Sequence, residues 1–236
     1  MVRSSLKFLL RSTALFFCAL GLLIPISAQS DAGDDRVQVE ITTPHGVMVV
    51  ELYNETPQHR DNFIKLAGEG FYDDLLFHRV MKNFMIQGGD PNSRDAKPGT
   101  ALGTGGPGYT VPAEFDPQFV HTKGSLCSAR QPDRSNPQRA SSGSQFYIVQ
   151  GNPMTPNQLA TFASRITEST GKPFAYMPEQ VAAYVELGGY PPLDTQYTVF
   201  GRVIKGLEVI DAIADQTVDS RNRPLEDLKM TVKVLK

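Results

Sequence analysis

The sequence predicts a mainly β fold in which antiparallel strands form a closed barrel capped by two α-helices. Two observations support this class. Apolar and polar side chains alternate in several short segments bounded by turn residues, as they do in strands that bury one face. Helical spacing of apolar residues is confined to two segments that we expect to cap the barrel and to one stretch at residues 151–192. Of the 236 residues, 40% are hydrophobic and 20% are charged, which suits a folded domain with a sizeable core.

The first half of the folded region contains strand signals around one helix. Residues 37–41 and 47–52 alternate apolar and polar side chains on either side of a Thr-Pro-His-Gly turn, which predicts a β-hairpin. Thr56 and Pro57 provide an N-cap and a first-turn proline, so we expect a helix that a following glycine ends. Two further strands are expected at residues 75–81 and 85–87, joined by a tight turn at residues 82–83.

The second half begins with a long loop at residues 88–117. This loop is rich in Gly and Pro, and a long ordered loop is usually functional. Within residues 151–192, Thr155-Pro156 and Pro178 open two helical runs. We expect strands at residues 124–130, 144–150, 197–203 and 228–235, a polar loop at residues 131–143 and a helix at residues 207–214.

The first 28 residues have the three parts of a secretory signal peptide. Three basic residues give a positive start, residues 14–24 form an apolar run, and Ala28 offers a small side chain for cleavage. The run is shorter than the ~20 residues that span a bilayer as a helix, and an uncleaved membrane anchor is the alternative. We therefore divide the chain into a signal peptide at residues 1–28, a polar tether at residues 29–36 and one domain at residues 37–236.

Removing the leader changes the charge and the cysteine count. Three basic residues and Cys18 leave with it, so the net charge falls from −2 to −5 and Cys127 is the one cysteine left. A chain with one thiol forms no internal disulfide. Cys127 lies in an apolar stretch, where we expect it to be buried. The acidic balance argues against nucleic acid as a partner.

The sequence offers no good site for a cofactor or a metal ion. Residues 103–108 match the G-x-G-x-x-G pattern of dinucleotide binding, but Pro112 prevents the helix whose N-terminus would hold the phosphate. The histidines lack the spacing of zinc ligands and do not join a cysteine pair. We therefore expect neither a cofactor nor a metal.

Three spaced motifs carry the functional prediction. They are FHRV-x3-FMIQGGD at residues 77–90, GSQFYI at residues 143–148 and TVFG at residues 198–201. Together and in this order they resemble the cyclophilins, the barrel family of peptidyl-prolyl cis-trans isomerases. The resemblance covers the chain from residue 37 onward, apart from residues 151–192. It implies an eight-stranded antiparallel barrel closed by two helices, with residues 151–192 as a helical insertion.

The resemblance also implies which residues form the site. Arg79 looks like the family's catalytic arginine, and Gln87 looks like the side chain that holds the substrate backbone. Ala129 and Arg130 look like the edge that pairs with the bound peptide, and Gln145 is similar to a supporting glutamine. The pocket for the substrate proline ring would be formed by Phe84, Met85, Tyr147 and Leu193, with Tyr197 where the family often has a histidine.

An arginine suits this chemistry because of what happens to the amide. Rotating an X-Pro bond passes through a twisted state that has lost resonance, over a barrier of ~18–20 kcal/mol. In that state the prolyl nitrogen regains a lone pair. A guanidinium donor aimed at this nitrogen binds the twisted form better than either planar form, which lowers the barrier. The step requires no nucleophile, proton transfer or metal.

Two positions depart from the family pattern. Tyr197 replaces the frequent histidine, and Pro192 stands where a tryptophan is frequent, in a chain without any Trp. We expect isomerase activity to be retained and cyclosporin-type inhibitors to bind weakly, because the indole donor is missing. The insertion rejoins the chain beside Leu193. It forms either a helical flap that shapes or covers the substrate groove or an element packed on the side of the barrel.

The sequence therefore predicts an exported isomerase, periplasmic or extracellular, that accelerates X-Pro isomerisation in folding proteins. Its partners would be proline-containing peptides and unfolded or folding proteins, and we expect a monomer. One alternative is a cyclophilin-like module that binds proline-containing segments with little turnover. Another is a chaperone that holds unfolded chains with the helical insertion.

Overall fold

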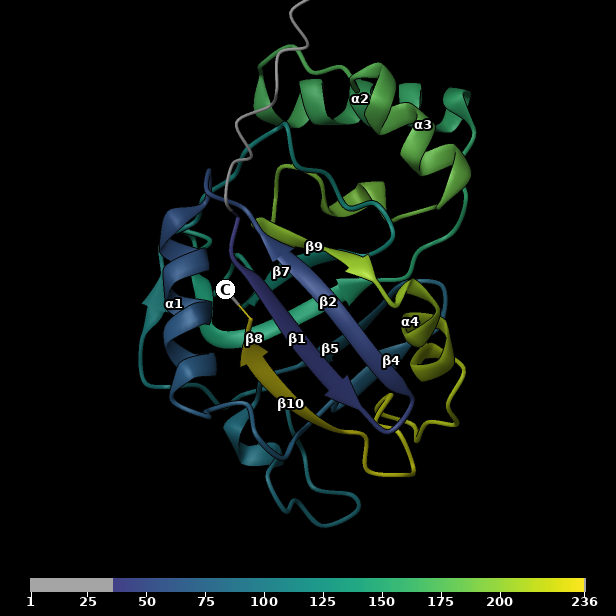
Figure 1. The fold of residues 1–236 in the computed structure, drawn as a ribbon. Coiled ribbons are helices and arrows are strands. Elements are labelled where there is room, and N and C mark those ends of the chain that lie inside the picture. Colours follow the sequence, from purple (N-terminus) through teal and green to yellow (C-terminus); the bar gives the residue numbers. More distant parts are fainter. Residues whose placement is uncertain (1–35, 236) are drawn as a thin grey trace, which may run out of the picture. The chain divides into compact units, whose positions relative to one another are not determined.

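A computed structural model describes residues 36–235, so the predicted leader and nearly all of the predicted tether lie outside the described residues. The described part contains one curled antiparallel sheet and four α-helices (Figure 1). Along the hydrogen-bonded neighbours, the strand order is β3-β10-β1-β2-β9-β7-β8-β5-β4, and β6 pairs with β8 outside this path. The mainly β class predicted from the sequence is confirmed.

The strands are β1 (Gln38–Thr43), β2 (Gly46–Leu52), β3 (Leu75–Leu76), β4 (Arg79–Met81), β5 (Met85–Gly88), β6 (Thr110–Val111), β7 (Ser125–Arg130), β8 (Ser141–Val149), β9 (Val199–Lys205) and β10 (Lys229–Val234). The α-helices are α1 (Pro57–Gly68), α2 (Pro156–Thr170), α3 (Pro178–Glu186) and α4 (Leu207–Ala214), and the 3₁₀ helices are η1 (Pro91–Ser93) and η2 (Pro191–Leu193). Among the helices described, none is long and apolar enough to cross a membrane.

The prediction of a closed eight-stranded barrel is wrong, because the sheet is an open half-barrel. Its edge strands β3 and β4 do not pair with each other within the described chain. The single strand expected at residues 75–81 is instead two strands, of which β3 pairs with β10 and β4 pairs with β5. Only Phe77 and His78 separate these two strands. Among the described strands, β3 pairs only with β10 and β4 pairs only with β5, at opposite ends of the strand order, so the ladder stays open between them.

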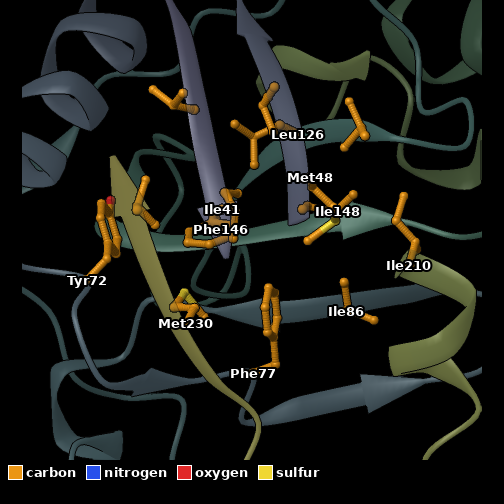
Figure 2. Close-up of a cluster of buried hydrophobic side chains, with 14 of the residues drawn as sticks. Ile41, Met48, Tyr72, Phe77, Ile86, Leu126, Phe146, Ile148, Ile210 and Met230 are labelled. Atoms are coloured by element: carbon orange, nitrogen blue, oxygen red, sulfur yellow. The ribbon is translucent and has the colours of Figure 1, made fainter. Parts of the chain in front are cut away.

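The main core lies between the curled sheet and the helices α1 and α4, which stand on either side of it (Figure 1). In the predicted hairpin of β1 and β2, Ile41 pairs with Met48, and both side chains are fully buried. Figure 2 shows these two side chains with Phe146, Ile148 and Ile210, gathered in the interior from strands and from α4. Burial of this apolar cluster is the main force that holds the sheet in its curl.

Helix α1 begins at Pro57, as predicted, but Thr56 does not cap it through its side chain. The carboxylate of Glu114 caps it instead. Oε1 of Glu114 accepts the backbone N–H of Gln58 at 3.1 Å, and Oε2 accepts the backbone N–H of His59 at 3.0 Å. The Thr56 hydroxyl is buried, with no hydrogen-bond partner in the described chain. A residue from the long loop before β7 has therefore taken over the role that the local sequence suggested for Thr56.

The insertion forms a small helical unit with its own apolar cluster, in which α2 packs against α3. Leu159 of α2 and Tyr184 of α3 are buried there against Val120, which precedes β7. Thr155 caps α2 through a capping box with Gln158, as its Thr-Pro signal predicts. The C-terminal end of the insertion is tied to the same segment before β7, because Gly189 forms a bridge with Thr122 and the backbone N–H of Tyr190 donates to the oxygen of His121.

Candidate active site

A cavity of about 360 Å³ lies on the face of the sheet opposite the main core. Successive side chains on a strand point to opposite faces. Ile86 of β5 and Ile148 of β8 belong to the main core, whereas their chain neighbours Met85 and Tyr147 belong to a second apolar cluster. The same strands therefore supply the core with one set of side chains and the cavity with the other.

The structure brings nearly all of the predicted site residues together. Gln145 does not line this cavity. Its side chain bonds to Gln87 and lines a neighbouring cavity of about 580 Å³. The other nine predicted residues line the first cavity: Arg79, Phe84, Met85, Gln87, Ala129, Arg130, Tyr147, Leu193 and Tyr197.

Arg79, Gln87 and Gln145 form a chain of hydrogen bonds across three neighbouring strands. Nη1 of Arg79 donates to Oε1 of Gln87 at 3.0 Å, and Nε2 of Gln87 donates to Oε1 of Gln145 at 3.1 Å. Nε2 of Gln145 then donates to the backbone oxygen of Gly105 at 2.7 Å. A glutamine amide accepts at its oxygen and donates at its nitrogen. The bond from Gln145 to Gly105 therefore fixes which way the Gln145 amide faces, and this in turn fixes the amide of Gln87 that accepts from Arg79. The guanidinium is held in place before any substrate arrives.

The environment of Arg79 strengthens its electric field. Its side chain is half-buried, and this burial lowers the pKa of the guanidinium from its usual value. An arginine nevertheless remains protonated in a protein. Nη2 also donates to the sulfur of Met81, and the guanidinium carbon lies 5.9 Å from the centre of the Phe84 ring. A cation among apolar groups is less screened than one in water, so it acts more strongly on a nearby electron pair.

The apolar wall of the cavity consists of buried and half-buried side chains. Met85 and Tyr147 are buried, while Phe84, Leu193 and Tyr197 are each partly exposed toward the cavity. The rings of Tyr147 and Tyr197 meet edge to face, with their centres 6.0 Å apart. A concave apolar surface of this kind suits a small ring such as that of proline.

Ala129 and Arg130 lie at a bulge in β7, where the register with β8 shifts between Ser128 and Arg130. The guanidinium of Arg130 lies 4.4 Å from the centre of the Tyr197 ring, and its Nε donates to the backbone oxygen of Gln196 at 3.0 Å. Arg130 therefore supports one wall of the cavity through its side chain. A shorter side chain such as asparagine could not cover the Tyr197 ring in this way.

Sequence reasoning missed one end of the cavity. His78 stands beside Arg79 within the first motif, and Gly103 begins the G-x-G-x-x-G pattern in the loop at residues 88–117. No motif marks the other segments at this end, which meet the site only through the fold. His78 is 4% exposed, and burial lowers its pKa from 6.5 to about 4, so its ring is neutral at pH 7. The residues that sequence reasoning left out are His78, Thr100, Ala101, Leu102, Gly103, Gln131, Asp219, Arg221 and Arg223.

Cys127 is fully buried, as the sequence predicts, and burial raises the pKa of its thiol. A buried thiol of this kind behaves as a small apolar side chain and not as a nucleophile. Within residues 36–235, no three His, Cys, Asp or Glu side chains gather in a way that would hold a metal ion.

Comparison with known proteins identifies the family. The family model described as cyclophilin type peptidyl-prolyl cis-trans isomerase/CLD matches residues 36–234. The chain belongs to the cyclophilin family. A Staphylococcus aureus (strain COL) protein, named as a peptidyl-prolyl cis-trans isomerase, is 36% identical over 197 residues, which are 82% of this chain and 88% of that protein. The activity of this cyclophilin family is peptidyl-prolyl cis-trans isomerisation, as the sequence motifs indicate.

A second relative is longer. A Streptococcus pyogenes protein, named as a bifunctional phosphatase/peptidyl-prolyl cis-trans isomerase, is 36% identical over 197 residues, and the match spans 81% of this cyclophilin but 37% of the relative. Among solved structures, a Cryptosporidium parvum cyclophilin has a TM-score of 0.59 at 22% identity, over 85% of this chain and 98% of that one. The same protein in the presence of the dipeptide Ala-Pro has a TM-score of 0.57, also at 22% identity, over 84% of this chain and 99% of that one. These similar structures share the cyclophilin fold.

Proposed function

We propose that this cyclophilin accelerates the cis-trans isomerisation of X-Pro bonds in exported proteins as they fold, and that Arg79 stabilises the twisted amide. The observation that carries the proposal is the position of the Arg79 guanidinium. It lines the same cavity as the apolar side chains of Phe84 and Tyr147, and Gln87 holds it in place. A site that fixes a proline ring beside a pre-oriented cation has the two parts that the reaction needs.

The proposed mechanism divides the work between the two parts of the cavity. The apolar wall holds the proline ring, while the acyl group that precedes it rotates. As the amide twists, the prolyl nitrogen becomes pyramidal and its electron pair becomes available. The Arg79 guanidinium has five N–H donors, of which Nη1 and Nη2 each use one on Gln87 and Met81. A further N–H then binds the nitrogen only in the twisted state, which lowers the barrier without strengthening substrate binding.

We place the substrate backbone along Gln87 and the bulged end of β7 at Ala129 and Arg130. The bulge interrupts the regular pairing of β7 with β8 at this point, and bulges are common next to active sites. The structure of the Cryptosporidium parvum cyclophilin in the presence of Ala-Pro supports an X-Pro peptide as the substrate class. The substrates would then be proline-containing peptides and unfolded or folding proteins, bound by a monomer.

The leader supports export, to the periplasm or the cell exterior. Residues 1–28 combine a basic start, an apolar run and a small residue before the proposed cleavage point. Expression in a bacterium followed by N-terminal sequencing tests this. We expect a mature protein that begins at Gln29 in the exported fraction. A full-length protein held in the membrane fraction would support the uncleaved anchor instead.

The decisive test of activity is a peptide isomerisation assay with the wild type and two variants of Arg79. Arg79→Ala is expected to lower kcat/KM by about 10²–10³-fold, the usual loss for a donor that acts on the transition state. Arg79→Lys keeps the charge but loses the fixed fork of donors, so it should recover only part of the rate. Arg202→Ala serves as the matched control, because Arg202 is exposed on β9 and its side chain pairs with Glu51.

The outcome also separates the proposal from its alternatives. Wild-type protein that binds X-Pro peptides without accelerating their isomerisation would support the binding module. Protein that prevents aggregation of an unfolded chain but does not bind X-Pro peptides would support the chaperone. Equal rates for the wild type and Arg79→Ala would overturn the proposed role of the arginine.

A further inference from the structure

A buried polar network lies directly behind the pocket wall. Asp194 follows Leu193, which lines the cavity, and is 1% exposed. Its Oδ1 accepts the backbone N–H of His121 and lies 2.8 Å from Nδ1 of the same residue. Its Oδ2 accepts the hydroxyls of Tyr176 and Tyr184, each at 2.7 Å. One buried carboxylate thus receives four donors, the full complement of hydrogen bonds that such a group needs away from water.

The partners of Asp194 determine where the protons lie. Burial raises the pKa of Tyr184 and Tyr176, and the negative charge of Asp194 raises them further, so both hydroxyls remain donors. Since Nδ1 of His121 faces a carboxylate oxygen, it carries a proton. Nε2 of His121 faces the other way and forms a hydrogen bond with the hydroxyl of Tyr147, at 3.0 Å. The Tyr147 hydroxyl is in this way directed into the protein, away from the cavity that its ring lines.

The network starts in the helical insertion and ends in the pocket. Tyr184 belongs to α3, and Tyr176 precedes that helix. No described residue between 151 and 192 lines the cavity. The insertion contacts the pocket from behind, through this network and through the ring of Tyr190, which lies 4.2 Å from the ring of Phe84. Its position is that of a support for the pocket wall and not that of a cover over the opening.

We propose that Tyr176 and Tyr184 are positioning residues of the isomerase. Through Asp194 and His121 they hold the Tyr147 hydroxyl, so that the ring of Tyr147 presents a fixed apolar wall to the substrate proline. This inference rests on the proposed function, because it assigns the insertion a role in binding the proline ring.

The expected consequence of breaking the network follows from the cost of unpaired buried groups. Removing both tyrosine hydroxyls leaves Oδ2 of Asp194 without its two donors, and a buried carboxylate in that state moves or takes in water. His121 then loses its fixed orientation, and the Tyr147 hydroxyl loses its bond to His121 and keeps only its weaker side-chain hydrogen bond with Cys127. A wall that is free to shift binds the proline ring less well in the ground state and in the transition state alike, which raises KM and leaves kcat nearly unchanged.

The test compares the wild type with the double variant Tyr176→Phe/Tyr184→Phe, which keeps both rings and removes only the two hydroxyls. We expect KM for an X-Pro peptide to rise roughly fivefold, with kcat altered by less than about twofold. Tyr72→Phe is the matched control. Tyr72 is a buried tyrosine of the main core whose hydroxyl bonds to the backbone of Ser144, outside the network.

Two further measurements separate positioning from simple stability. Nitrogen NMR of the imidazole should show His121 protonated at Nδ1 in the wild type and a changed tautomer population in the double variant. In a Tyr147→Phe background, where the positioned hydroxyl is already absent, removing the two hydroxyls should cause no further rise in KM. A double variant that melts at a lower temperature but keeps the wild-type KM and His121 tautomer would overturn the inference. So would a full fivefold rise that persists in the Tyr147→Phe background.

Failure of the proposed function gives a different result. A wild-type protein without isomerase activity would refute that function, while the dissociation constant of the X-Pro peptide and the His121 tautomer would still decide whether the tyrosines position Tyr147. An unchanged dissociation constant in the double variant would then count against the inference.

Discussion

Arg79 and Gln87 stand directly opposite each other on β4 and β5, and Nη1 of Arg79 donates to Oε1 of Gln87 at 3.0 Å. Side chains that face each other across an antiparallel pair are held at a fixed distance by the backbone ladder. The direction of the guanidinium is therefore set by strand pairing, and its final orientation is set by one amide group. Gln87 therefore orients the arginine, in addition to the contact with the substrate backbone that we propose for it.

Substitution of Gln87 tests this dependence. We expect Gln87→Ala to lower kcat/KM about tenfold or more, because the guanidinium loses the acceptor that orients it and the substrate loses a polar contact. Gln145→Ala should have a smaller effect in the same direction, since it removes only the support behind Gln87. The peptide isomerisation assay measures both. Gln216→Ala is the control, because Gln216 is a half-buried glutamine that follows α4 and bonds to the backbone of Ala212, away from the cavity. A loss in this control as large as that of Gln87→Ala would contradict the prediction.

The cap of α1 gives a stability prediction that the local sequence would not. Glu114→Ala should lower the free energy of unfolding by about 2 kcal/mol, because the N–H groups of Gln58 and His59 lose their acceptor. Thr56→Val should cost nothing or stabilise slightly, because the Thr56 hydroxyl is buried and unbonded in the described chain. Urea unfolding at pH 7 measures both. A loss for Thr56→Val as large as that for Glu114→Ala would show that the threonine is the true cap.

The burial of His78 makes stability depend on pH. Its pKa is about 4 in the folded protein and 6.5 in the unfolded chain. The stability that neutral His78 contributes is therefore complete above pH 6.5 and is lost as the pH falls from 6.5 to about 4. In this range His78 is protonated in the unfolded chain but remains neutral in the folded protein. The full loss is about 3 kcal/mol.

His78→Phe should remove this part of the pH dependence. Urea unfolding at pH 7 and at about pH 4 compares the variant with the wild type. The variant retains a smaller acid loss from His59, whose pKa is also lowered by burial. An identical decrease in the two proteins would mean that His78 is protonated in the fold.

Inhibitor binding tests the altered wall of the pocket. We expect cyclosporin-type inhibitors to bind weakly, because Pro192 and Tyr197 replace the tryptophan and histidine that are frequent at these positions in the family. Calorimetric titration should give no nanomolar affinity for the wild type. Pro192→Trp, which restores an indole donor, should bind more tightly than the wild type, and a nanomolar dissociation constant for the unmodified protein would contradict the expectation.

Local patterns in the sequence predicted much of the fold, and the family resemblance predicted half of the cavity lining. Alternation located the hairpin of β1 and β2, and Thr-Pro signals located the starts of α1 and α2, since both depend on neighbouring residues only. The resemblance named nine residues that line one cavity, and five of them lie within the three motifs. On β5 and β8, strand alternation directs side chains such as Met85, Gln87 and Tyr147 to the face away from the main core.

The features that the sequence left hidden all depend on contacts between distant segments. Glu114 caps a helix that starts 57 residues earlier, and no local pattern marks a cap supplied from so far away. Asp194 gathers partners from the segment before β7 and from the insertion. The barrel is open between β3 and β4 because the two halves of the segment at residues 75–81 pair with different strands, β10 and β5. Pairing of this kind is decided by the whole sheet.

The alternation of side chains along β8 between the core and the cavity limits where this protein tolerates insertions and deletions. Phe146 and Ile148 face the core, and Tyr147 between them faces the cavity. Deleting a single residue within β8 would exchange the two faces, placing the tyrosine in the core and a core side chain in the pocket. The connection that begins after Val149 has no such constraint, and it accommodates two helices. Lineages of such proteins should therefore vary in length at this connection, while β5, β7 and β8 keep their residue count.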